Sequence, residues 1–425
     1  MSEVDAVVQG RCFVGGNLEQ CAIGISDGRI VRIAKTIDGD KVFDFGTKLV
    51  LPAAIDAHVH MREPGMTHKE DFASGSLAAL HGGVTCVLDM PNTRPPTTTV
   101  SALREKKELA SSRSLVDFGL FAGVQPGVDI AGLAIEAVGF KLYMGGTTGD
   151  LLAHPLGTVR REIEAVASTR KVLAVHAEDE SLRNKGVEDS LDDHLKNRNN
   201  GCETSAVRKI IDAAAGCRLH ICHVSAKETL PILSKAADVS SEVTPHHFLL
   251  DRTNRLGTYG KVNPPLRRRE DRQAMFQALK EGAFDVIASD HAPHTADEKS
   301  EDFDYAPCGM PGVETMLPLL LHLVRDRHLA LTSVVRMVCE RPGEIHGLRK
   351  GRIEVGYDAD LVVVDLMAGS EIKGDRLLTK CGWTAFEGMP AIFPRAVFVR
   401  GEQMMEGDSQ VGEAKGRDVV EGQPS

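Results

Sequence analysis

Eight short apolar runs, separated by segments long enough for helices, fill the middle of this 425-residue chain. Strands that alternate with helices indicate βαβ units and a parallel sheet. Eight such repeats over about 250 residues are the size of a (β/α)8 barrel, also called a TIM barrel. We expect the strands at 50–60, 84–90, 116–124, 137–143, 172–176, 218–223, 241–246 and 284–290. The predicted fold class is therefore α/β, with a TIM barrel as the main domain.

The two ends of the chain carry a different pattern, of short strands joined by tight turns. Residues 21–26 and 29–34 flank Asp27-Gly28, a pair typical of a β-hairpin turn. Because neither end has enough strands to close a core, we expect both ends to form one small β-sandwich. The predicted domains are 1–52 and 346–406 for the sandwich, 53–345 for the barrel, and 407–425 for a mobile tail.

Charge and composition exclude several classes of protein. The 50 Lys and Arg residues stand against 60 Asp and Glu, a net charge of −10, which argues against a nucleic-acid partner. No apolar run approaches the roughly 18–20 residues of a membrane span, and the first ten residues do not resemble a secretion signal. The nine cysteines are scattered and form no C-x-x-C pair, so we expect free thiols in a cytoplasmic protein.

The run at 50–60 ends in two histidines with one residue between them, followed by an arginine. Side chains alternate along a strand, so His58, His60 and Arg62 are expected to face the barrel mouth together. Two imidazoles at this spacing can bind one metal ion, and an arginine can hold a carboxylate through two hydrogen bonds. Alone the pattern is a weak signal, because two hydrogen-bonded barrel histidines would look the same.

Lys141 lies inside the apolar run at 137–143. A buried lysine is costly when charged and unpaired, and burial lowers the pKa of its amine. One interpretation is a lysine at a strand end whose amine reaches solvent. The other is a neutral amine that has reacted with CO₂, giving a carbamate whose two oxygens could bridge two metal ions.

Three more runs end in a histidine or an aspartate, namely His176, His223 and Asp290. All these residues are expected at the barrel rim where the active sites of TIM barrels lie, so the sequence predicts a binuclear metal site. Imidazole, carboxylate and carbamate ligands suit Zn²⁺. Two such ions would convert a bridging water to hydroxide, and Asp290 would act as general base and acid. The predicted chemistry is metal-assisted hydrolysis of an amide-like bond, or its reverse.

The motifs of the chain resemble those of the cyclic amidohydrolases, and within them the class I dihydroorotases. The similarity runs from about residue 50 to 352, and the flanking strands follow the same plan. The motifs are DAHVHMREPG (56–65), HKEDFASG (68–75), MPNT (90–93), KLY (141–143), HAE (176–178), ICHVSA (221–226), NPPLR (263–267), SDHAPH (289–294) and GMPGVET (309–315).

This resemblance implies a zinc-dependent, reversible cyclisation of N-carbamoyl-L-aspartate to L-dihydroorotate, a step of de novo pyrimidine (UMP) biosynthesis. It implies two zinc ions in each subunit. One would be bound by His58, His60 and Asp290, the other by His176 and His223, and carboxylated Lys141 would bridge both.

The resemblance also implies residues that bind the substrate. Arg62, Asn92 and His294 would hold its carboxylate, while Asn263, Met310 and Pro311 would contact its ring. Certain relatives bind a third zinc through residues that match Cys222, Glu242 and His247, and this stays an alternative for the present chain.

Two competing functions remain. Allantoinases share the histidine pair, the REPG segment and the lysine, but residues 90–93 and 263–265 favour dihydroorotase. A catalytically dead homologue could act as a scaffold for other pyrimidine enzymes, although such chains lose metal ligands and this one keeps every expected one. We expect an enzyme that acts on a small molecule, forms a homo-oligomer and could associate with other enzymes of the pathway.

Overall fold

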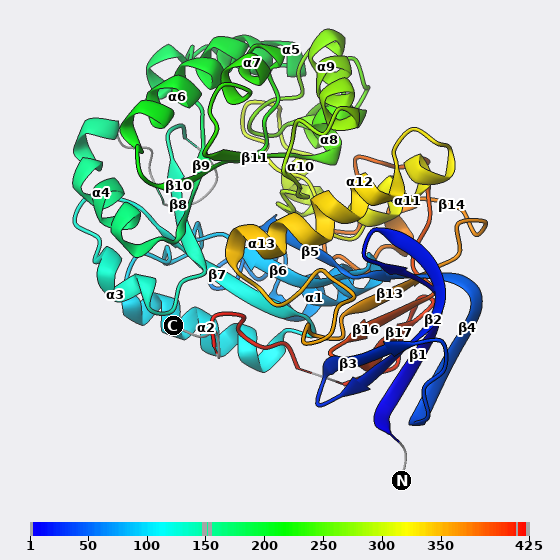
Figure 1. Ribbon diagram of the computed structural model, residues 1–425. Coiled ribbons are helices and arrows are strands. Elements are labelled where there is room, and N and C mark those ends of the chain that lie inside the picture. The colour runs from blue at the N-terminus through cyan, green and yellow to red at the C-terminus, as the bar shows by residue number, and fades with distance from the viewer. Residues whose placement is uncertain (1–2, 147–150, 152–154, 414, 422–425) are drawn as a thin grey trace.

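The structure, a computed structural model, describes residues 3–146, 151, 155–413 and 415–421. It confirms the TIM barrel: eight parallel strands follow one another in chain order around the barrel (Figure 1). A parallel bridge between Val59 and His291 brings the first and last edges of this sheet together. The strands are β5 (Ala54–Val59), β6 (Val84–Asp89), β7 (Asp117–Gly123), β8 (Gly139–Tyr143), β9 (Val172–His176), β10 (Arg218–Ile221), β11 (Val239–Val243) and β12 (Val286–Ile287).

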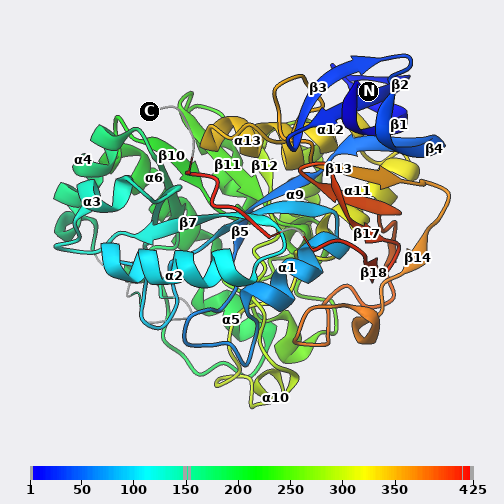
Figure 2. The same ribbon diagram turned by 90° about the horizontal axis from the view of Figure 1, so that it is seen from below.

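Helices lie around the outside of the barrel and connect its strands (Figures 1 and 2). The first, α1 (Phe72–His81), is capped by Asp71, whose side chain accepts a hydrogen bond from the Ser74 amide in a capping box. This cap fixes where the loop after β5 ends. The other helices are α2 (Val100–Arg113), α3 (Ile130–Ala134), α4 (Arg160–Thr169), α5 (Leu191–Asn197), α6 (Asn200–Ala213), α7 (Leu230–Leu233), α8 (Pro245–Leu249), α9 (Arg269–Lys280), α10 (Ala296–Lys299), α11 (Met316–Arg325), α12 (Leu331–Val335) and α13 (Arg341–His346).

Strands from both ends of the chain form a second sheet beside the barrel, as predicted (Figure 1). Its order is β18-β17-β16-β13-β4-β1-β2-β3. The predicted hairpin joins β2 to β3, and Asp27 and Gly28 have φ of 51° and 75°, which a tight hairpin turn requires. The strands are β1 (Val4–Val14), β2 (Asn17–Ser26), β3 (Arg29–Ala34), β4 (Gly39–Pro52), β13 (Leu361–Val364), β16 (Ala396–Val399), β17 (Glu402–Glu406) and β18 (Ser409–Gln410).

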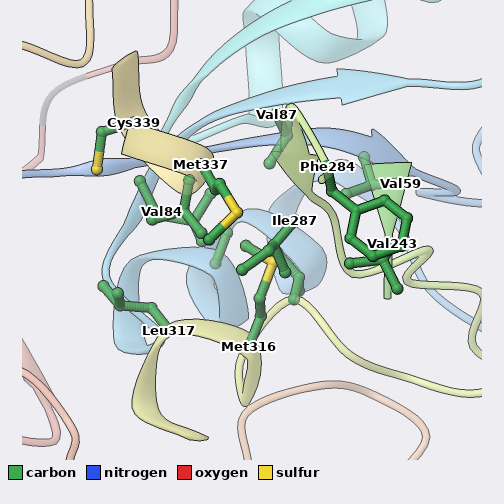
Figure 3. Packing of buried hydrophobic residues seen from close by; sticks show 14 of the residues in the cluster. Val59, Val84, Val87, Val243, Phe284, Ile287, Met316, Leu317, Met337 and Cys339 are labelled. Carbon is green, nitrogen blue, oxygen red and sulfur yellow. The ribbon is translucent and has the colours of Figure 1, made fainter. Parts of the chain in front are cut away.

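The largest apolar cluster packs the barrel strands against the elements that follow the barrel (Figure 3). Val59 and Ile287 come from the first and last barrel strands, Met316 and Leu317 from α11, and Met337 from the helical turn after α12. Aliphatic side chains dominate because aromatic residues are only 4% of the chain. This packing holds the carboxyl ends of the strands in fixed positions, where the predicted site residues lie.

A segment between β13 and β16 leaves the second sheet and packs on the barrel rim. It contains the short pair β14 (Ser370–Glu371) and β15 (Pro390–Ala391). Trp383 from this segment lies in one apolar cluster with Leu250 and Met310. Its indole Nε1 donates a hydrogen bond to the His294 carbonyl at 2.8 Å. The segment therefore supports the loop that follows the last barrel strand.

Seven of the eight predicted strands have different bounds in the structure, and three of them differ by more than two residues at one end. The run at 50–60 is divided, because β4 ends at Pro52 in the second sheet and β5 begins at Ala54 in the barrel. The run at 241–246 ends early, because Pro245 starts α8 and places His246 in a helical turn. The run at 284–290 keeps only Val286–Ile287 as a strand.

The tail at 407–425 was expected to be mobile, but its described part makes backbone pairings. Ser409–Gln410 forms β18 of the second sheet, and residues 417–419 pair with the barrel. The Phe118 amide donates to the Arg417 carbonyl, and the Val419 amide donates to the Phe118 carbonyl, each at 2.9 Å. Asp418 forms an ion pair with Lys107 of α2 at 2.8 Å. Figure 2 shows this red segment crossing the barrel near β7 and α2. Among the described residues, none of the helices has the length and apolar character needed to cross a membrane.

Candidate metal centre and active site

One cavity at the carboxyl ends of the barrel strands brings together all six residues predicted to bind metal. Arg62, Asn92, Asn263 and Met310 line the same cavity. His294 and Pro311 are buried nearby but are not among the described residues that line it. The six predicted ligands are His58, His60, Lys141, His176, His223 and Asp290.

His58 in β5 and His60 directly after β5 are each oriented by a hydrogen-bond partner from elsewhere in the barrel. His58 Nδ1 lies 2.5 Å from a Glu242 oxygen, and His60 Nδ1 lies 2.6 Å from the Asn92 amide oxygen. Both bonds leave the Nε2 atoms free to face the cavity, and those atoms lie 3.4 Å and 3.1 Å from Asp290 Oδ1. Asn92, which the resemblance assigns to the substrate carboxylate, thus orients His60 in the structure.

Lys141 projects from β8 into the same group of side chains and is fully buried. Its Nζ lies 2.9 Å from Cys222 Sγ and 3.4 Å from His58 Nε2. No carboxylate is within ion-pair distance of this amine among the described residues. The amine does not reach solvent, which removes the interpretation of Lys141 as a strand-end lysine.

His176 and His223 form the opposite side of the centre. His176 Nδ1 lies 3.0 Å from His223 Nε2, and His176 Nε2 lies 2.9 Å from a Glu178 carboxylate oxygen. Glu178 also pairs with the buried guanidinium of Arg198 at 2.5 Å. A histidine that donates one ring N–H to a carboxylate presents its other nitrogen to a metal ion. His176 Nδ1 is that nitrogen here.

Several site residues have backbone conformations that non-glycine residues rarely adopt. Among the described residues, seven non-glycine positions have a positive φ, and three of them are Arg62, His223 and Asp290, at 62°, 35° and 46°. Such conformations cost about 1–3 kcal/mol each and persist where the surrounding structure enforces them. Their concentration in one cavity marks it as a functional site.

Electrostatics around the centre favour a bound cation. Burial lowers the pKa of His60 to about 4 and holds the pKa of His223 well below its usual value, so both rings are neutral and can offer lone pairs. Burial and the Lys141 amine also act to lower the pKa of His58, but the Glu242 and Asp290 carboxylates outweigh them and raise it to about 10. These carboxylates attract positive charge to the cavity.

The spacing of the donor atoms also fits metal binding. His58, His223 and Asp290 each offer a ligand atom, and these atoms lie within 4.8 Å of one another. Ligand atoms around a tetrahedral ion with metal–ligand bonds of about 2.0–2.1 Å are roughly 3.3 Å apart. The separations of 3.1 Å for His60–Asp290 and 3.0 Å for His176–His223 are close to that value.

A second group that could hold an ion differs from the one implied by the resemblance. Cys222 and Glu242 are grouped with His58 rather than with His247. His247 is engaged elsewhere, with its Nδ1 2.8 Å from Thr244 Oγ1 and its Nε2 3.1 Å from the Pro264 carbonyl. The ligand set that includes His247 is therefore not assembled in the structure.

Arg62 is a cationic residue of the cavity wall, and neighbouring groups outside the cavity hold its guanidinium in place. Its Nε donates to the Pro293 carbonyl at 3.1 Å, and its terminal nitrogen lies 3.2 Å from His294 Nε2. Lys69 donates to His294 Nδ1 at 3.0 Å, so His294 supports Arg62 instead of facing the cavity. Gly309 lets the neighbouring loop pass close by, because a Cβ there would lie 2.4 Å from the Ala292 carbonyl and its φ is 142°.

Sequence reasoning did not identify several residues of the site. Glu178, Arg198 and Lys69 orient the residues that were identified, and Tyr143, His246 and Cys308 line the cavity itself. Glu178 stands inside the quoted HAE motif, where its position two residues after His176 was an available signal. Lys69 and Tyr143 likewise stand inside the quoted HKEDFASG and KLY motifs. Arg198, His246 and Cys308 carry no signal that separates them from ordinary polar residues of a barrel.

A TIM barrel whose rim gathers four histidines, an aspartate and a buried lysine defines a metal-dependent hydrolase class. The chain belongs to the Amidohydrolase family, whose model matches residues 49–404. Curated relatives are named dihydroorotase. That of Methanosarcina mazei is 39% identical over 92% of each chain, and that of Halobacterium salinarum is 40% identical over 93% of this chain and 98% of the relative. That of Thermoplasma volcanium is 37% identical over 99% of each.

Solved structures of a hydantoinase and a dihydropyrimidinase share the fold. An L-hydantoinase (dihydropyrimidinase) from Arthrobacter aurescens has a TM-score of 0.92 at 29% identity and covers 96% of this chain and 98% of that chain. A dihydropyrimidinase from Brevibacillus agri has a TM-score of 0.88 at 24% identity over 98% of each chain, a likeness that shows the fold alone.

Proposed function

We propose that this chain is a dihydroorotase, which interconverts N-carbamoyl-L-aspartate and L-dihydroorotate in pyrimidine biosynthesis. The observation that carries the proposal is that relatives named dihydroorotase match nearly the whole chain at 33–40% identity. The cavity supports it, because a buried arginine stands beside the metal-binding side chains. A substrate with one carboxylate and one cyclic amide needs both features.

We propose that two zinc ions bind in the cavity. His58, His60 and Asp290 would hold one ion, and His176 and His223 the other. Lys141, carboxylated by CO₂, would bind both, and its burial beside His58 supports this role. When bound, the ions would supply Lewis acidity and lower the pKa of a water molecule between them.

Asp290 is proposed to move the proton of the reaction. In the ring-opening direction, a water oxygen bonds to the ring carbonyl carbon and the amide C–N bond breaks. Asp290 takes the proton from that water and delivers it to the leaving nitrogen, which balances the step. Its carboxylate lies 3.1 Å from His60 Nε2 and lines the cavity, which supports this role.

The substrate carboxylate is proposed to bind Arg62, with Asn92 and His294 acting beside it. Asn263 and the loop of Met310 and Pro311 would contact the ring. Arg62, Asn263 and Met310 line the cavity, which supports direct contact. Since His294 lies behind Arg62, its contribution would come through holding that guanidinium.

The proposal is tested by the substrate range of the zinc-loaded protein. We expect turnover of L-dihydroorotate, and little turnover of allantoin, hydantoin or 5,6-dihydrouracil, none of which carries the ring carboxylate. The structural likeness to hydantoinases and dihydropyrimidinases makes a carboxylate-free cyclic amide the second candidate substrate. Turnover of dihydrouracil or hydantoin without turnover of dihydroorotate would replace the proposal by that alternative.

We also propose a cytoplasmic homo-oligomer that could associate with other enzymes of the pathway. All nine cysteines are free thiols, which suits a reducing compartment. Sedimentation of the purified protein would give its oligomeric state.

A further inference from the structure

A histidine that none of the roles above uses lies on the wall of the cavity. His246 is in the first turn of α8, directly after β11, and only 2% of it is exposed. It lines the cavity together with Asp290 and Arg62. Its Nε2 has no hydrogen-bond partner among the described residues. A buried polar atom without a partner costs about 1–3 kcal/mol, so its persistence in a cavity wall calls for a partner from outside the protein.

The adjacent His247 differs from His246 in its hydrogen bonds, and the comparison separates a histidine that supports the loop from one that is open to a ligand. The rings of His246 and His247 have centroids 4.4 Å apart, and both are buried. Both ring nitrogens of His247 are satisfied, by the Thr244 hydroxyl and the Pro264 carbonyl. Of this pair, His247 therefore holds the loop together and His246 faces the cavity with an unused nitrogen.

The charge state of His246 defines what it can bind. Burial lowers its pKa to about 4, against the attraction of Asp290 and together with the repulsion of His58. The ring is neutral near pH 7 and offers one N–H donor and one acceptor. A neutral ring of this kind suits an uncharged partner such as an amide or a urea, whereas a carboxylate is better matched by Arg62.

We propose that His246 is a substrate-contacting residue whose Nε2 hydrogen-bonds the ureido group of the substrate. This inference rests on the proposed function, because the proposed substrate has three polar parts. They are the carboxylate, the carbonyl that reacts and the ureido group. Arg62 takes the carboxylate, the metal-binding side takes the reacting carbonyl, and the urea is the part that remains. Strand β11 is the neighbour of β12, so His246 and Asp290 line the cavity from adjacent strand ends, on the side where the leaving nitrogen receives its proton.

The test compares His246→Ala and His246→Gln in the zinc-loaded protein. The probes are N-carbamoyl-L-aspartate and N-carbamoyl-β-alanine, which keeps the ureido group and lacks the α-carboxylate. We expect His246→Ala to weaken binding of both probes, measured by calorimetry, by about tenfold, the effect of one buried hydrogen bond. His246→Gln places an amide near the Nε2 position and should keep most of the affinity. Arg62→Met should weaken binding of N-carbamoyl-L-aspartate alone.

Each contrary outcome has a distinct meaning. Wild-type affinity of His246→Ala for both probes overturns the inference, and so does a loss confined to N-carbamoyl-L-aspartate. A fall in zinc content of His246→Ala, measured by elemental analysis, would make His246 a metal ligand and also overturns it. If the wild-type protein turns over dihydroorotate while any of these results is found, the inference alone fails. If the zinc-loaded wild type neither turns over dihydroorotate nor binds the two probes, the proposed function fails and the inference with it.

Discussion

The hydrogen bond between His60 and Asn92 gives the sharpest prediction about metal binding. The bond is 2.6 Å long, and its partners are 8% and 3% exposed. Asn92→Ala removes the amide oxygen that accepts from His60 Nδ1, so the ring loses its fixed tautomer and orientation. Loss of such a partner lowers metal affinity by about 10–100-fold. That range corresponds to about 1.4–2.8 kcal/mol at 25 °C.

The assay titrates the metal-free protein with zinc against a competing chelator, and then measures KM for dihydroorotate at saturating zinc. Asn92→Asp is the matched control, because it keeps an acceptor for His60 and should keep the metal affinity. An Asn92→Ala protein with the zinc affinity of the wild type and only a raised KM would refute the reasoning. Asn92 would then act on the substrate carboxylate, as the resemblance alone implies.

Three further predictions concern the support of the cavity. Arg62→Met should lower kcat/KM for dihydroorotate by roughly 10–150-fold, the effect of one charge-assisted hydrogen bond, while the zinc content stays unchanged. A drop of less than about threefold in steady-state kinetics would contradict this prediction. Trp383→Phe removes the donor to the His294 carbonyl and should lower the free energy of unfolding by about 1 kcal/mol in urea titrations. Equal urea midpoints for the variant and the wild type would argue against this prediction. Burial lowers the pKa of His194, but Cys308 and Glu188 outweigh burial and raise it from 6.5 to about 9. This raised pKa adds stability that is complete below pH 6.5 and is lost as the pH rises through about 9. Melting temperatures from pH 6 to 10 should therefore fall less steeply for His194→Gln than for the wild type, and parallel curves would contradict the assignment.

The position of the metal centre could be predicted from the sequence because parallel strands share an edge. The five residues are spread over more than two hundred positions, yet each lies within or at the end of a predicted strand: His58, Lys141, His176, His223 and Asp290. Strand periodicity, and the rule that TIM-barrel active sites lie at the carboxyl ends of the strands, were enough to predict that these residues form one site. The exact strand bounds were not needed, since β12 is only two residues long and Asp290 still reaches the cavity.

Roles that depend on tertiary contacts could not be predicted. His294 follows the last strand and resembles a substrate contact, but Lys69 and Trp383, distant in sequence, hold it behind Arg62. His246 and His247 are neighbours in the sequence, and only the structure shows that one of them is fully hydrogen-bonded.

The tail was predicted from its polar composition to be mobile, because nothing local signals its pairing with Phe118. That pairing joins residues about three hundred positions apart. Sequence patterns report short-range structure and strand periodicity, whereas such a contact depends on the assembled barrel.

The most direct test of the central claim is the zinc content of the dialysed protein, measured beside dihydroorotate turnover in the wild type and in Lys141→Ala. We expect two zinc ions for each wild-type chain. In Lys141→Ala we expect loss of most of the metal and of turnover, with partial recovery of the rate when short carboxylic acids replace the missing carbamate. A Lys141→Ala protein with full zinc content and the wild-type rate would contradict the account.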